Sequence, residues 1–420
     1  MKTVQEYLDE VCGTISCIPY RRTIRRELKS HMEDSITKKK AQGMDPKEAV
    51  RQTISELGDA RELGLSYQQN MSMQPNYRLF AFAFLPFLLY MMAALNLKTA
   101  VFNMNLALFI CFWGICCILP AALRKFDLEK HYIFLKYVYI TLMLFAVPVS
   151  LLADIKARQF CMEVIGIGLI FLIVFFVYRL QVFGGHGGVA ALLFFLLPIP
   201  LFLVTNTYAA LFLYLTIGVS TFAAYAKKEK GFCGKWLILM PVTFTITAGT
   251  VLILCRDSIV RRLNNWNNFF LRTNPSPASL AEHYETYPLA AGIGIYGYWT
   301  VAVYAALILL ILIELLQMKK KMHHFLARHI LNSIALILLT KTVFAILLNL
   351  GYPVFTSFAL PFAGTAPEQF SNLFLIALAQ YTFCFGNAMF SDYSFHAENR
   401  FLESIDGKIT FYFKSTQEEQ

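Results

Sequence analysis

The chain has 420 residues, of which 57% are hydrophobic and only 15% carry a charge. This balance is typical of a protein with many membrane-spanning helices and argues against a purely soluble one. The formal net charge of +10 does not indicate a nucleic-acid partner, because the basic residues lie mostly in short loops between apolar runs, where they orient a membrane protein.

Residues 1–70 are expected to form a separate helical domain. Gly43 is expected to end its second helix, and Asp45, followed by Pro46, is expected to cap its third. Apolar residues recur at helical spacing in two stripes, which are Tyr7, Leu8, Val11 and Ile15, and then Ile24, Leu28, Met32 and Ile36.

This first domain also resembles a known module. The residues that carry the likeness are Glu27-Leu28, His31, Asp34, Gly43, Glu48-Ala49, Gly58-Asp59 and Leu63-Gly64. They are similar to the permease prefix domain that precedes some bacterial membrane proteins. The resemblance implies a cytoplasmic module of a regulatory or interaction type, with no chemistry of its own.

The rest of the chain predicts an all-α membrane domain at residues 79–392, reached through a linker at 71–78. A spanning helix needs roughly twenty apolar residues. About ten runs meet that criterion: Leu79–Leu97, Phe102–Leu123, Tyr132–Leu152, Phe160–Tyr178, Gly188–Val204, Tyr208–Ala226, Trp236–Cys255, Pro288–Leu316, His329–Leu350 and Phe370–Phe390.

Basic clusters predict the orientation of these spans in the plasma membrane. They fall in alternate loops, around Arg124, Lys227 and Lys319. Because basic loops stay in the cytoplasm, we expect both chain ends there, including a tail at 393–420.

The apolar pattern is interrupted between Lys341 and Asn372. Asn349, Pro361, and several glycines and further prolines break the helix there. Such backbone cannot face lipid, because unpaired N–H and C=O groups are costly there. It must lie on the water side or fold back into a cavity lined by protein. Lys341 itself either snorkels to the surface or marks a functional site, since a charge in mid-helix costs roughly 2.5–3.5 kcal/mol.

Gly292, Gly294 and Gly297 spell the GxGxxG pattern of nucleotide-binding folds. No strand precedes them, and they lie in an apolar run, so the pattern predicts close helix packing instead.

The loop from Arg256 to Tyr287 is expected on the outer face. It carries Arg256, Arg261 and Arg262 and closes with His283 and Glu285. Arginines there run against the usual charge rule, and stabilising an anion is one reason for such an exception. A polar interfacial loop without chemistry is the other reading of the same residues.

Several stretches together resemble the SEDS family of shape, elongation, division and sporulation proteins, of the FtsW, RodA and SpoVE type. The matching features are the ten predicted helices and outer loop, together with Arg261-Arg262, His283 to Glu285, Asn349-Leu350-Gly351, Pro353-Val354, Leu360-Pro361-Phe362 and Gly364-Thr365. The resemblance implies polymerisation of lipid II, a polyprenyl-diphosphate sugar lipid, beside a transpeptidase partner (a penicillin-binding protein). It implies no cofactor, and nothing in the sequence indicates a divalent cation.

The chain departs from the family pattern at important points. Glu285 stands where the family has its presumed basic aspartate, the outer loop is short, and a serine–tyrosine–glycine–glycine run is reduced to Ala363-Gly364-Thr365. The extra methylene of a glutamate moves its oxygens by more than an ångström, and such a shift can cost about a hundredfold in rate.

Three interpretations therefore stay open. In one, the protein is an inverting glycosyltransferase, with Glu285 as base and His283 orienting or replacing it. In the second, it is a non-catalytic membrane protein that binds a lipid or cell-wall partner and reports through the prefix domain. In the enzyme reading, Arg256, Arg261 and Arg262 hold the diphosphate, while Asn349, Pro361 and their loop shape the acceptor channel. A transporter that uses Lys341 as a coupling charge is a third, weaker reading.

Overall fold

The computed structural model describes the following parts of the chain. These are residues 3–15, 18–71, 75–96, 132–152, 155–181, 193–205, 207–228, 287–322, 324–350, 360–363, 366–389, 402–405 and 408–411, with isolated residues between 110 and 114 and between 249 and 264.

Four helices form the N-terminal domain: α1 (Val4–Thr14), α2 (Ile18–Ala41), α3 (Pro46–Leu57) and α4 (Ala60–Met71). The predicted apolar stripes are buried between them. The predicted cap is confirmed, because the Asp45 carboxylate accepts a hydrogen bond from the backbone N–H of Lys47, at 3.0 Å. Gly43 follows α2 with a φ of 90°, a left-handed conformation that suits glycine.

The described residues after this domain form nine further helices: α5 (Tyr77–Asn96), α7 (Tyr132–Leu152), α8 (Ile155–Gln181), α10 (Ile199–Val204), α11 (Tyr208–Lys228), α14 (Pro288–Tyr296), α15 (Trp299–Lys321), α16 (Phe325–Asn349) and α17 (Ala366–Met389). Among the described residues, α5, α15 and α16 are each long and apolar enough to cross a membrane. The chain is therefore a membrane protein. Shorter apolar stretches lie at Tyr137–Val149, Cys161–Val174, Leu193–Val204 and Tyr208–Ala224, and the number of ten spans stays a prediction.

The structure corrects one expectation about secondary structure and adds two strands in the tail. The predicted single helix Pro288–Leu316 is two helices, because Gly297 ends α14 with a φ of 75° before α15 begins. The tail holds an antiparallel hairpin of β1 (Leu402–Ile405) and β2 (Lys408–Phe411), in which Leu402 lies opposite Phe411. Apart from this hairpin, the described elements are helical, in line with the predicted all-α class.

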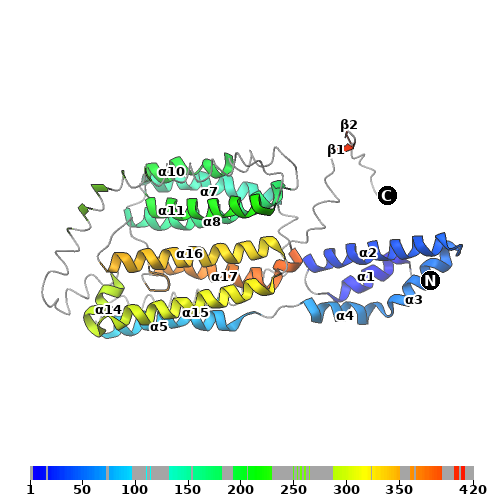
Figure 1. Ribbon diagram of the computed structural model, residues 1–420, viewed down its shortest axis with the longest axis horizontal. Coiled ribbons are helices and arrows are strands. Elements are labelled where there is room, and N and C mark those ends of the chain that lie inside the picture. The colour runs from blue at the N-terminus through cyan, green and yellow to red at the C-terminus, as the bar shows by residue number, and fades with distance from the viewer. Residues whose placement is uncertain are drawn as a thin grey trace.

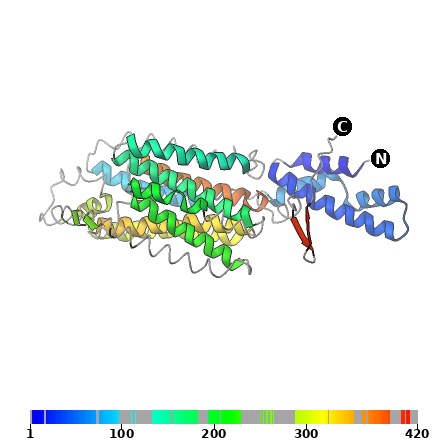
Figure 2. The same cartoon turned by 90° about the horizontal axis from the view of Figure 1, so that it is seen from above.

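The helices form one elongated bundle with the N-terminal domain at one end (Figures 1 and 2). Helices α7, α8, α10 and α11 pack together as one group, and α5, α14, α15, α16 and α17 as a second. Contacts of α8 with α16 and α17, and of α11 with α16, join the two groups. The end of the bundle away from the N-terminal domain, which carries α14, is called the distal end below.

Candidate functional site

Three of the predicted site residues, His283, Glu285 and Arg262, lie outside the described residues. Arg256 and Arg261 are described and are exposed, each in a helical stretch. The guanidinium Nε of Arg261 donates a hydrogen bond to the carbonyl of Asp257, at 3.3 Å. That these arginines lie close to Glu285 therefore stays a prediction.

Asn349, the last residue of α16, is 2% exposed and forms hydrogen bonds with a second helix. Its Oδ1 accepts hydrogen bonds from the backbone N–H groups of Leu289 and Ala290, both at 3.1 Å. Its Nδ2 donates to the carbonyl of Ala345, at 2.8 Å. Asn349 thereby satisfies two N–H groups in the first turn of α14, where a helix has no internal acceptors.

Pro361 lies in a short turn, residues 360–363, that is buried in the bundle. Leu360 and Phe362 are 3% and 0% exposed. The hydroxyl of Tyr304 on α15 donates a hydrogen bond to the carbonyl of Pro361. This interrupted segment was expected either on the water side or folded back into the protein. Its described residues lie inside the protein. Phe362 has a φ of 59°, a conformation that is strained for a residue with a side chain.

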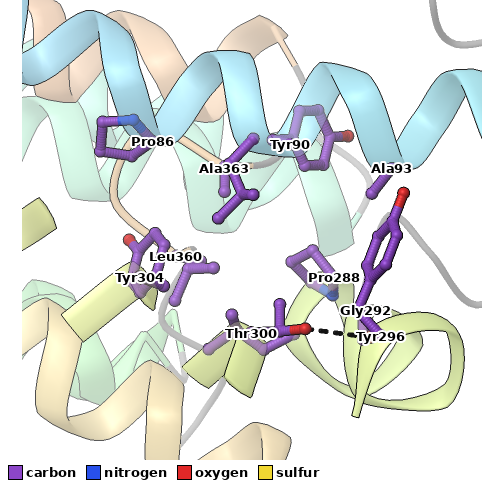
Figure 3. A pocket seen from close by; sticks show the side chains of 12 residues that line it. Pro86, Tyr90, Ala93, Pro288, Gly292, Tyr296, Thr300, Tyr304, Leu360 and Ala363 are labelled. Carbon is purple, nitrogen blue, oxygen red and sulfur yellow. Dashed lines mark hydrogen bonds between the residues drawn. The ribbon is translucent and has the colours of Figure 1, made fainter. Parts of the chain in front are cut away.

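A pocket opens at the distal end between α5, α14, α15 and this buried turn (Figure 3). Its lining is mostly apolar, with tyrosine side chains among it. The lining residues are Pro86, Leu89, Tyr90, Ala93, Pro288, Leu289, Gly292, Tyr296, Thr300, Tyr304, Leu360 and Ala363. The space between these side chains is about 20 Å³, so a ligand with an apolar chain would have to part them to enter.

Gly292 lets α14 and α15 approach each other at this pocket. A Cβ atom there would lie 2.6 Å from Cγ2 of Thr300, and the Thr300 hydroxyl donates a hydrogen bond to the Gly292 carbonyl, at 3.1 Å (Figure 3). The prediction of close helix packing is thus confirmed for Gly292.

A charged cluster lies inside the bundle around Lys341 of α16, which is 0% exposed. Its ammonium group donates hydrogen bonds to three acceptors: Oε1 of Glu163 at 2.5 Å, Oδ1 of Asn372 at 2.9 Å and Oγ of Ser371 at 3.2 Å. The Ser371 hydroxyl also donates to Oε1 of Glu163, at 3.1 Å. Lys341 does not snorkel to the surface, since its charge is paired within the bundle.

A second polar cluster holds the start of α5 at the end of the bundle nearest the N-terminal domain. The backbone N–H and C=O of Asn76 both bond to the side-chain amide of Gln380, at 2.9 and 2.6 Å. The Asn76 side chain donates to Oε1 of Glu314, at 2.5 Å. Since Glu314 is 6% and Gln380 is 0% exposed, the linker is fixed to α15 and α17 through buried groups.

Sequence reasoning singled out Lys341 but missed its partner Glu163, and it also missed Glu314. Both signals were readable, because each is an acid in a predicted apolar span. Among the described residues, no three His, Cys, Asp or Glu side chains are grouped as metal ligands would be.

Comparison of the chain with models of protein families, with curated proteins and with solved structures gives no match.

Proposed function

We propose that this chain is a SEDS-like membrane protein that binds a polyprenyl-diphosphate-linked sugar lipid at the distal end of its bundle. One observation carries the proposal. Three of the described residues of the stretch that resembles the family, Asn349, Leu360 and Pro361, lie at or beside the distal pocket. Leu360 lines the pocket, Asn349 caps the helix that forms one wall, and Pro361 bonds to Tyr304 of another.

The reaction that we propose is an inverting sugar transfer. An acceptor hydroxyl attacks the anomeric carbon, the bond from that carbon to the diphosphate oxygen breaks, and the diphosphate leaves with the electron pair. Glu285 takes the hydroxyl proton, with His283 orienting it. Arg256, Arg261 and Arg262 stabilise the charge that grows on the leaving diphosphate. The product is a longer glycan strand.

This function belongs at the outer face of the plasma membrane, with both chain ends in the cytoplasm. A glycan strand made there needs cross-linking, so the proposed partner is a transpeptidase.

The test is polymerisation of labelled lipid II by the full chain in lipid nanodiscs. We expect polymer from the wild type, none from Glu285→Ala, and a partial activity from Glu285→Asp. Glu62→Ala, an exposed change in α4, is the control and should behave as the wild type. If Glu285→Ala polymerises like the wild type, Glu285 is not the base.

A second candidate is a non-catalytic protein that binds a lipid or cell-wall partner and passes the signal through the N-terminal domain. The polar cluster of Asn76, Glu314 and Gln380 favours it, because it fixes the linker to two helices of the bundle. Helix α2 also contacts α17 directly. This function predicts saturable lipid binding without product, and a phenotype on deletion of residues 1–70 alone. A normal phenotype of that deletion would argue against it.

A further inference from the structure

The cluster around Lys341 has no role in the proposed reaction, although it places an ion pair inside the described bundle. An ion pair buried among helices loses hydration on both charges, and apolar side chains of similar volume often hold helices together as well or better. An ionisable residue within a membrane domain therefore indicates a functional site, and its partners indicate the kind of site.

The geometry of the cluster is that of a site for an anion. The ammonium of Lys341 and the hydroxyl of Ser371 both donate to the same oxygen, Oε1 of Glu163. Asn372 accepts from the ammonium and so holds it in place. We call Lys341, Ser371 and Asn372 the cradle. An ammonium and a hydroxyl converging on one oxygen would also suit a phosphate oxygen.

The two sides of this ion pair differ in burial. The cradle residues are 0%, 2% and 0% exposed, whereas the Glu163 side chain keeps 17% of its exposure. Its other oxygen, Oε2, accepts no hydrogen bond from the described part of the chain. Glu163 is therefore the more accessible partner of the ion pair.

The two sides also come from different helix groups. Glu163 is on α8, and the cradle is on α16 and α17. Among the described residues, this is the one ion pair that joins the two groups. Lys341 lies eight residues before Asn349, or about 12 Å along the helix axis, so the cradle is nearer to the distal end of α16 than to its other end.

We propose that the cradle is a binding site for the phosphate group of a membrane lipid, and that Glu163 occupies it at rest. A phosphate entering between the two helix groups replaces the carboxylate, keeps Lys341 paired, and releases Glu163. The choice of a polyprenyl phosphate as the first ligand to test rests on the proposed function. The site itself would also take the phosphate of a glycerophospholipid.

The experiment measures binding of labelled undecaprenyl phosphate to the full chain in dodecyl maltoside micelles, which carry no phosphate. Glu163→Gln keeps the shape of the side chain and removes its charge, so the lipid no longer competes with an anion, and we expect about tenfold tighter binding. Lys341→Met should weaken binding by about tenfold or more, and the double variant should bind like Lys341→Met alone. Unchanged or weaker binding by Glu163→Gln would overturn the proposal.

The exchange of charges, Glu163→Lys with Lys341→Glu, keeps an ion pair between the helix groups. It is the control for weak binding that results only from misfolding of a single variant. It should give a stable protein that does not bind the lipid. Wild-type binding by this variant would contradict the cradle.

Two competitors separate the sources of phosphate and separate this proposal from the proposed function. If phosphatidylglycerol binds with the same variant pattern and undecaprenyl phosphate does not, the cradle stands and the polyprenyl-lipid function fails. If lipid II is polymerised but neither lipid responds to Glu163→Gln, the cradle fails and the function stands. Displacement by inorganic pyrophosphate, with no lipid binding, would contradict a lipid ligand.

Discussion

Asn349 joins the end of α16 to the start of α14, because its side-chain oxygen accepts a hydrogen bond from the backbone N–H of Leu289, at 3.1 Å. The contact is buried and links residues 60 positions apart. An asparagine at the end of an apolar helix thus acts as the cap of a different helix, and it holds one wall of the distal pocket.

Replacing Asn349 with alanine should loosen α14. Two buried N–H groups would lose their acceptor, at a cost of about 1–3 kcal/mol. We expect faster amide hydrogen exchange in residues 288–296, measured by mass spectrometry of the full chain. Asn349→Asp keeps the accepting oxygen and should retain more of the protection. Equal exchange in both variants and the wild type would show that the cap is dispensable.

Tyr304→Phe should destabilise the buried turn at residues 360–363. It removes the hydroxyl that bonds to the Pro361 carbonyl and leaves that buried oxygen short of a donor, which costs about 1–3 kcal/mol. A lower thermal unfolding midpoint and weaker lipid binding are the expected results. Tyr298→Phe is the matched control, since Tyr298 is 76% exposed and should tolerate the change.

Gly292→Ala should push α14 away from α15. The new methyl group would meet Cγ2 of Thr300 at 2.6 Å, and such overpacking typically costs about 1–3 kcal/mol. Thr300→Ser removes that Cγ2 and keeps the hydroxyl bonded to Gly292, so it should rescue most of the loss of thermal stability. Gly13→Ala, at a position with nothing within 4 Å, should be tolerated. A lack of rescue by Thr300→Ser would place the strain elsewhere.

The link between Asn76 and Glu314 should appear as an interaction energy. In a double-mutant cycle with Asn76→Ala and Glu314→Ala, contacting residues typically show non-additivity of about 0.5–3 kcal/mol. Thermal or denaturant unfolding of the full chain gives the values. Asn76→Ala combined with the exposed Glu62→Ala should be additive. Additivity in both cycles would mean that the buried contact does not couple the linker to α15.

Cys12 should react slowly with iodoacetamide at pH 8 in the folded chain. Burial raises the pKa of this thiol, and Arg21 opposes the rise. A raised pKa lowers the thiolate fraction at pH 8, and only the thiolate attacks the reagent. We expect a rate about tenfold or more below that of the denatured chain, followed through the peptide that carries Cys12. Equal rates would show that α1 is not packed as described.

The sequence predicted the elements that depend on local rules. The cap at Asp45 and the break at Gly43 follow from residues next to each other, and the described helices α5 and α16 start and end close to the apolar runs. The break at Gly297 was missed, because a hydropathy window averages over a single residue.

Contacts between distant residues could not be predicted in this way. Lys341 was readable as a costly charge, but its pairing with Glu163 spans 178 positions, and no periodicity reports which acid faces which base. The same holds for Asn76, whose partners Glu314 and Gln380 lie far along the chain on α15 and α17. Asn349 was selected as a candidate for the site, and its role as a helix cap is visible only in three dimensions.

Photo-crosslinking tests whether the distal pocket receives the chain of a polyprenyl-diphosphate lipid. A lipid with a diazirine in its prenyl chain, irradiated with the full chain in phosphatidylcholine nanodiscs, should label peptides that contain Leu89, Leu289 and Leu360. The face of α7 around Leu144 and Phe145, which is exposed in the bundle, reports random labelling from lipid. Enrichment at the pocket over α7 is the predicted result, and equal labelling of both regions would contradict the claim.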